Sequence, residues 1–228
     1  MKKLKYIFLL AGALSLASCE SWLDEDPQYT INTKTQFSTV ENAKQALMGC
    51  YGYMSADNAY GQAWQEVTFG YCGFGWSQTN GSSTDLLVSM DGGIDETINT
   101  MAWRGMYKVI GETNAFIANI ADSPLESADK LPMEAAARFL RALAYYNLAV
   151  TYGDVPLKTT PSAHDGVAVP RSPKSEVFEL VRTDWEFAYE NLPEKDDDGF
   201  ATKWAAKAYL GKLYHTLGCQ VLRNLFFN

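Results

Sequence analysis

The stretch from Pro132 to Gly153 constrains the fold most, because nearly every side of it is apolar when it is wound as a helix. One apolar face recurs at helical spacing, and alanine and tyrosine fill most of the remaining positions. That face is made of Ala136, Phe139, Leu140, Leu143, Tyr146 and Val150. A helix that is apolar on several sides is covered by neighbours on several sides, so the stretch predicts a mainly helical protein.

Other segments repeat the helical spacing and carry start and stop signals. Proline is favoured in the first helical turn, and glycine just after the last. Strand signals are few, so we expect antiparallel helix pairs. Residues 57–93, rich in glycine and aromatic residues, predict a long irregular loop region with room for one short helix. The further helices are expected from the capping box Ser38-x-x-Glu41, from near Glu96 to Ser123-Pro124, from Ser172-Pro173 to Pro193, and from Thr202 to Gly218.

The N-terminus reads as an export signal followed by a lipid anchor. Residues 1–5 hold three lysines, residues 6–16 are almost continuously apolar, and Leu16-Ala17-Ser18-Cys19 matches a bacterial lipobox. We therefore expect a signal peptide over residues 1–18, lipidation of Cys19, and an acidic tether over residues 19–36. The alternative is an ordinary signal peptide whose cleavage site adjoins a cysteine. Loss of the three lysines changes the formal charge from −8 to −11.

Composition and motif searches exclude several kinds of site. An acidic chain lacks the positive charge that neutralises phosphates, so nucleic-acid binding is not expected. Two histidines without metal spacing partners, and three cysteines besides Cys19, predict no metal site, no cofactor and no complete disulfide framework. No nucleophile, zinc or phosphate-loop motif occurs, so we expect no enzyme. A glycosidase using Asp91 or Asp95 remains the catalytic alternative.

The irregular region supplies the best candidate binding site. Aromatic rings stack on the apolar faces of sugars, and neighbouring amides bind their hydroxyl groups. The alternative, which we favour for any one ring, is that these rings pack the loop onto the helices. The candidate glycan-binding residues here are Trp64, Tyr71, Phe74, Trp76 and Asn80.

Four segments together resemble the SusD/RagB family of outer-membrane nutrient-binding lipoproteins. Their order and spacing match the family from Cys19 to about Gly218. They are Ser18-Cys19-Glu20-Ser21-Trp22-Leu23-Asp24-Glu25-Asp26-Pro27, Arg138–Leu148 with Tyr152–Leu157, Pro170–Pro173 with Asn191-Leu192-Pro193, and Thr202–Leu210.

The resemblance implies a tetratricopeptide-like helical scaffold with long irregular loops. It also implies binding of oligo- or polysaccharide at the cell surface and delivery to a SusC-like TonB-dependent transporter in the outer membrane. Thr84-Asp85 looks like the family's pair before its ligand-binding loop, which adds Asp85 to the candidate site. The residues from 86 to 93 include no aromatic residue, unlike starch-binding members. The alternative function is a helical-repeat adaptor that binds protein at the outer membrane.

Family members are considerably longer than this chain. We therefore expect residues 37–218 to be the N-terminal part of the SusD-like helical domain. Residues 219–228 read as an aberrant apolar tail, which suggests a truncated or frame-shifted reading frame.

Overall fold

The computed structural model describes residues 33–70, 72, 74–75, 88–90, 97–161, 169–196 and 198–218. These residues belong to one compact unit that begins at Thr33. The predicted mainly helical class is confirmed. The elements are α2 (Thr33–Gln36), α3 (Val40–Ser55), the π-helix η2 (Asp57–Gly61), α4 (Ala63–Gly70), α6 (Thr97–Ala121), α7 (Ser127–Tyr152), β1 (Val155–Pro156), β2 (Arg171–Ser172), α8 (Lys174–Asn191) and α9 (Lys203–Thr216).

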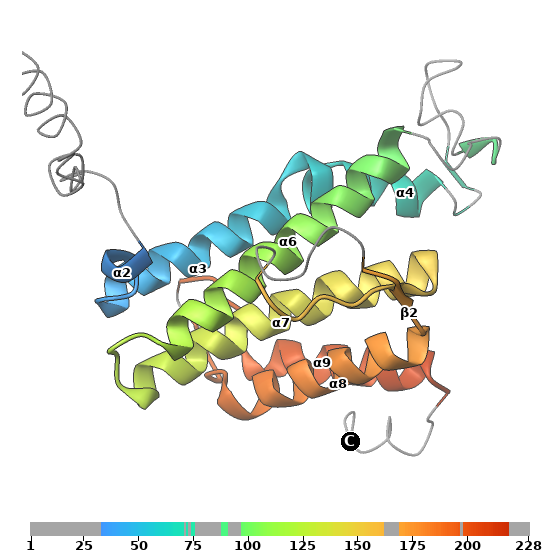
Figure 1. Cartoon of the computed structure of the whole chain (residues 1–228). Helices are drawn as coiled ribbons and strands as arrows, with labels where there is room; N and C mark the ends of the chain where they lie inside the picture. The colour runs from blue at the N-terminus through green and yellow to red at the C-terminus, as the bar shows by residue number, and fades with distance from the viewer. Residues whose placement is uncertain are drawn as a thin grey trace, which may run out of the picture. The chain divides into compact units, whose positions relative to one another are not determined.

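Helix α7 lies in the middle of the bundle, as its apolar circumference predicts. Helices α6 and α8 pack on either side of it, α3 packs on α6 and α7, and α9 packs on α8 (Figure 1). Every residue from Ala135 to Ala149 except Arg138 is buried. The only strands among the described residues are β1 and β2, which pair antiparallel with Pro156 opposite Arg171. This ribbon closes the chain reversal between α7 and α8.

The helix ends differ in places from the sequence prediction. The cap of α3 is Thr39 rather than Ser38, because the Thr39 hydroxyl accepts a hydrogen bond from the Asn42 amide at 3.2 Å. Helix α7 begins at Ser127, so Pro132 lies inside the helix and does not open it. Pro132 is the sixth residue of α7, beyond the first amides that lack a helical acceptor, so the helix forgoes one hydrogen bond to the Ala128 carbonyl oxygen there. Gly153 ends α7 with a φ of 77°, as predicted.

The region predicted as irregular is helical in its first part, over η2 and α4. There η2 lies against Gly105 of α6, and a Cβ atom added at Gly105 would lie only 1.9 Å from the Asn58 carbonyl oxygen. Only glycine allows the two backbones to approach so closely. The close approach fixes η2, and the chain that follows it, on the first turns of α6.

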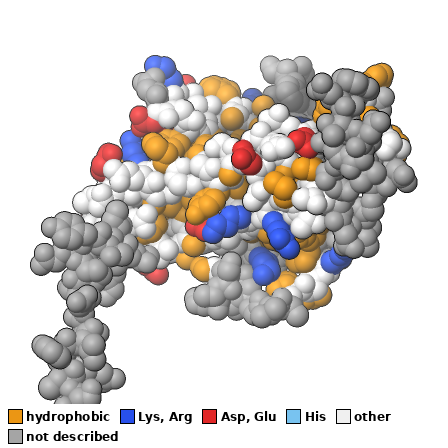
Figure 2. Space-filling model, turned by 90° about the horizontal axis from the view of Figure 1, so that it is seen from above, with side chains coloured by type: hydrophobic (Ala, Val, Ile, Leu, Met, Phe, Trp, Pro, Cys, Tyr) orange, Lys and Arg blue, Asp and Glu red, His pale blue; other side chains and the backbone are white. Residues whose placement is uncertain are grey.

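Hydrophobic side chains fill the interior, and some remain exposed. The face formed by α3 and α6 shows them scattered among charged and neutral polar side chains (Figure 2). Cys50 is buried on α3, as predicted, and burial raises the pKa of its thiol to about 12. Among the described residues, no helix is both long enough and apolar enough to cross a membrane.

Candidate functional site

Several elements that frame the predicted site meet at one end of the bundle, which we call the loop end. Helix α4 ends there and α6 begins there, and the same end holds the C-terminus of α7, the ribbon of β1 and β2, and the start of α8 (Figure 1). Of the predicted glycan-binding residues, the structure describes Trp64 on α4 and Phe74 shortly after this helix. Tyr71, Trp76, Asn80, Asp85 and the lipidation residue Cys19 lie outside the described residues.

The structure separates the two described rings of the predicted site. Phe74 is 93% exposed, whereas Trp64 on α4 is only 7% exposed. The Trp64 ring packs beside Tyr60 with 6.4 Å between ring centroids. The protein thus covers the Trp64 ring, which favours the packing interpretation for this residue, and leaves the Phe74 ring open to solvent.

Phe74 has exposed apolar neighbours in sequence and space. Phe69 at the end of α4 is 57% exposed, and Met90 is 64% exposed. A Cβ atom added at Gly75 would lie 3.1 Å from the Phe69 ring and 3.2 Å from Val88, so the end of α4 and the chain at Val88 come together at Gly75. An exposed apolar patch of this kind marks a binding surface more often than an isolated exposed residue does. The sequence prediction did not include Phe69, although its place among the aromatic residues of this region was a usable signal.

A second group of rings lies half-buried at the loop end. Trp103 lies 5.0 Å from Tyr107 and 5.1 Å from Tyr152, measured between ring centroids. Both tyrosine hydroxyls donate to backbone carbonyl oxygens, Tyr107 to Pro156 at 2.7 Å and Tyr152 to Asn99 at 3.3 Å. These bonds hold the rings in fixed orientations. Burial, and secondarily Tyr145, raise the pKa of Tyr107 well above its ordinary value, so its hydroxyl stays a donor.

A buried ion pair joins the middle of α7 to the middle of α8. The Arg141 guanidinium donates two hydrogen bonds of 2.8 Å to the Asp184 carboxylate, which is fully buried. It donates a third, of 2.9 Å, to the Asn114 side chain. Asn114 in turn donates to the carbonyl oxygens of Lys158 and Thr160. The network therefore ties α6, α7 and α8 to the segment that follows β1.

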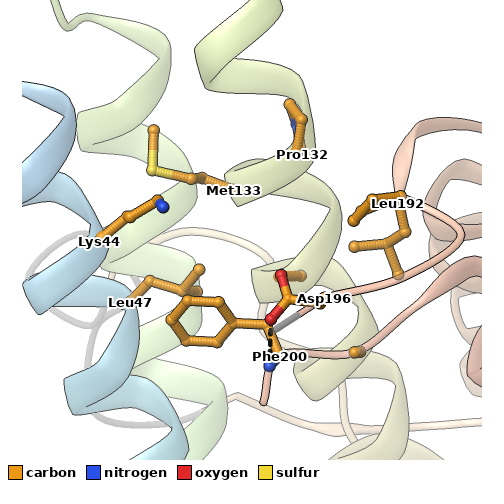
Figure 3. Close-up of a pocket in the computed structure, with 10 residues that line it drawn as sticks. Lys44, Leu47, Pro132, Met133, Leu192, Asp196 and Phe200 are labelled. Carbon is orange, nitrogen blue, oxygen red and sulfur yellow. Dashed lines mark hydrogen bonds between the residues drawn. The ribbon is translucent and has the colours of Figure 1, made fainter. Parts of the chain in front are cut away.

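A hollow of about 350 Å³, open solvent included, lies at the other end of the bundle. Leu47, Met133 and Phe200 form its apolar lining, and Lys44 and Asp196 lie at its edge (Figure 3). The two charged groups already have partners. Lys44 pairs with Asp198 at 3.3 Å, and the Asp196 carboxylate accepts the Phe200 amide at 3.0 Å. The hollow therefore offers no unpaired polar group to a ligand.

Within the described ranges, no three His, Cys, Asp or Glu side chains are placed to hold a metal ion. Asp91 and Asp95, the pair considered for glycoside hydrolysis, lie outside those ranges. The described part of the site thus consists of aromatic and apolar surface with basic residues beside it.

Comparison with known proteins identifies the fold. Residues 21–215 match a SusD-like family described as starch-binding and associating with the outer membrane. A SusD-like protein of Formosa agariphila is 25% identical over 223 residues, which cover 92% of this chain and 42% of that protein. A SusD-like protein of Bacteroides ovatus is 28% identical over 218 residues, 93% of this chain and 39% of that protein.

Solved structures agree with the sequence matches. A SusD superfamily protein of Bacteroides thetaiotaomicron superposes with a TM-score of 0.69 at 25% identity, over 79% of this chain and 43% of that one. A laminarin-binding SusD-like protein superposes with a TM-score of 0.70 at 25% identity, over 83% and 42%. A structure with a xylogluco-oligosaccharide gives a TM-score of 0.67 at 26% identity, over 75% and 34%.

These matches confirm the tetratricopeptide-like scaffold that the sequence predicts. The chain spans about two fifths of the length of the curated relatives it matches. Because the family match covers most of the sequence, this chain belongs to the SusD-like family of outer-membrane-associated proteins.

Proposed function

We propose that this chain binds an oligo- or polysaccharide at the cell surface and delivers it to a SusC-like TonB-dependent transporter. It does so without chemical turnover, as a lipoprotein anchored to the outer membrane through Cys19. The exposed Phe74 ring carries the binding proposal, because the described part of the fold leaves this ring 93% exposed. The laminarin-binding protein and the structure with a xylogluco-oligosaccharide, both similar in fold, support glycan as the ligand class.

The binding proposal is tested by calorimetric titration of the full chain with a panel of glycans that includes laminarin and xyloglucan oligosaccharides. Phe74→Ala removes an exposed stacking ring and is expected to weaken binding. Trp204→Ala is the matched control, since Trp204 is 51% exposed and lies in the first turn of α9, which the Lys203 amide ties to the Pro193 carbonyl oxygen just after the end of α8. Equal weakening by both variants would contradict a stacking role for Phe74. Failure of every glycan to bind, with retained capture of the transporter, would favour the protein-binding adaptor.

The anchoring proposal needs a separate experiment. Cys19→Ala removes the thiol that would carry lipid, so the variant is expected in the soluble periplasmic fraction, whereas the unaltered chain fractionates with the outer membrane. Persistent fractionation of Cys19→Ala with the outer membrane would contradict the lipid anchor. Delivery predicts that a SusC-like barrel, identified by mass spectrometry, co-purifies with the anchored chain.

A further inference from the structure

Most basic side chains in the described part of the chain have a partner, except at the loop end. Arg138 and Arg141 pair with Asp184, and Arg182 pairs with Glu179 and Glu186. Seven lysines form salt bridges with carboxylates, cation–π contacts with aromatic rings, or hydrogen bonds with backbone carbonyl oxygens. They are Lys44, Lys108, Lys130, Lys174, Lys203, Lys207 and Lys212. These cations already have a partner within the protein, which a ligand would have to replace.

Three cations differ from these. Within the described ranges, the charged groups of Arg104, Lys158 and Arg171 form no salt bridge and no cation–π contact. Arg104 and Arg171 are exposed and Lys158 is half-buried. Their sequence positions are far apart, yet the fold brings all three to the surroundings of Tyr107.

The contacts of Tyr107 show how this happens. Its hydroxyl donates to the Pro156 carbonyl oxygen, and Pro156 pairs with Arg171 across the ribbon. Lys158 follows two residues after Pro156 and is held by its backbone, whose amide donates to the Tyr145 hydroxyl at 2.6 Å. Arg104 precedes Tyr107 by three positions on α6, which places the two side chains next to each other on the helix surface. The half-buried Trp103 and Tyr152 complete the aromatic part of the same surface.

One opposing charge lies nearby, and the backbone hydrogen bond that fixes it does not neutralise it, so the cations of this surface outnumber it three to one. Asp154 lies two residues before Pro156, and its carboxylate accepts the backbone amide of Lys174 at 2.8 Å, at the start of α8. In a chain with a net charge of −8, three unpaired cations around one aromatic cluster form a local positive surface.

We propose that the surface of Arg104, Lys158 and Arg171 around Trp103 and Tyr107 recognises an anionic glycan. This inference rests on the proposed glycan binding and narrows its ligand class to sugars bearing carboxylate or sulfate groups. Guanidinium groups bind both oxyanions through paired hydrogen bonds, and the aromatic side chains contact the apolar edge of the sugar. The rest of the chain, being acidic, repels a polyanion and so confines it to this surface.

Titrations of the full chain in detergent test the proposal with three probes: oligogalacturonate, a sulfated galactan oligosaccharide and laminarin oligosaccharide. We expect at least one anionic probe to bind more tightly than laminarin, and the one that binds identifies carboxylate or sulfate as the recognised group. Arg104→Gln and Arg171→Gln should each weaken that binding about tenfold, the loss of one charge-assisted contact. Higher salt should weaken it further because the cations are exposed.

Arg182→Gln is the matched control, because it changes the net charge equally at a pair on α8 and should leave the affinity unchanged. Two results would overturn this inference and leave glycan binding intact. One is that laminarin binds as tightly as both anionic probes. The other is that Arg104→Gln and Arg171→Gln both leave the affinity for the anionic probes unchanged. No binding of any of the glycans would overturn the proposed function as well. A third outcome is that no anionic glycan binds, but that the chain binds phosphatidylglycerol vesicles and both arginine variants lose this binding. That result would assign the surface to lipid and overturn the inference.

Discussion

Replacement of Gly105 by alanine should destabilise the protein, although alanine favours the helix. The added Cβ atom would lie 1.9 Å from the Asn58 carbonyl oxygen, 2.4 Å from the Asn58 carbonyl carbon and 3.0 Å from the Ala59 nitrogen. Ordinary contact begins near 3.4 Å, so η2 must move by about 1.5 Å relative to α6, as an overpacked site requires. All three neighbours are backbone atoms, and no side-chain rotation relieves the contact.

The magnitude follows from two opposing effects. Alanine in place of glycine stabilises a helix interior by roughly 1 kcal/mol. Overpacking costs about 1–3 kcal/mol, and more where backbone must shift. We expect the second effect to exceed the first, so that Gly105→Ala lowers the free energy of unfolding by about 2 kcal/mol, which corresponds to a fall in Tm of roughly 4–8 °C.

Gly49 is the matched control on α3, because a Cβ atom added there has no neighbour within 4 Å. Gly49→Ala therefore gains the helix propensity alone and should raise Tm by about 2–4 °C. Thermal unfolding followed by circular dichroism measures both variants side by side. A Gly105→Ala protein with an unchanged or higher Tm would refute the argument that η2 is held against the α6 backbone at this position.

Three further predictions concern the ion network, the candidate rings and alkaline pH. Arg141→Gln leaves a buried carboxylate without its main partner and should lower the free energy of unfolding by about 3–5 kcal/mol in urea titrations; a loss below about 1 kcal/mol would contradict the importance of the pair. Trp64→Ala should lower Tm strongly, whereas Phe74→Ala should leave Tm unchanged and weaken glycan binding, and the reverse pattern would reject the assignment of the two rings. Burial raises the pKa values of Tyr51 and Tyr60 to about 12 from 10.0, so the unfolded chain loses these protons first. Burial likewise raises the pKa of the Cys50 thiol from 9.0 to about 12. Stability should therefore fall as the pH rises from about 9 to 12, as urea midpoints measured against pH would show; a stability that rises over that interval would contradict the burial of these groups.

The sequence predicts the central position of α7 well, because a helix that is apolar on all sides is stable only when other elements surround it. The same reasoning does not separate Trp64 from Phe74, whose exposed fractions are 7% and 93%. Both rings lie in a stretch without a regular period, so no repeat distinguishes an inward from an outward side chain. The grouping of Arg104 and Arg171 around Tyr107 likewise depends on which segments the fold brings together, which one sequence with scattered arginines does not show.

The glycine at position 105 also escapes prediction, for a related reason. In the sequence it is one small residue within a long helix, where glycine is merely unfavourable. Its role depends on the backbone of η2, which lies against it only after the chain has turned back from α3. The predicted helix starts at Ser38 and Pro132 show a smaller error of the same kind. The observed cap of α3 is Thr39, and α7 begins at Ser127, a few residues from the predicted starts.

The hydrogen bond from the Ala201 amide to the Tyr51 hydroxyl, at 2.9 Å, joins residues 150 positions apart. Closing a loop of that length costs about 2.4 kcal/mol more in chain entropy than closing one of ten residues. Helices α6, α7, α8 and α9, by contrast, each pack on the next along the chain. In a chain that emerges from a translocation channel N-terminus first, α3 appears early and packs on α6 and α7, but its bond to Ala201 waits for the last described part of the chain. Refolding rates should therefore be more sensitive to changes between α6 and α8 than to changes at Tyr51.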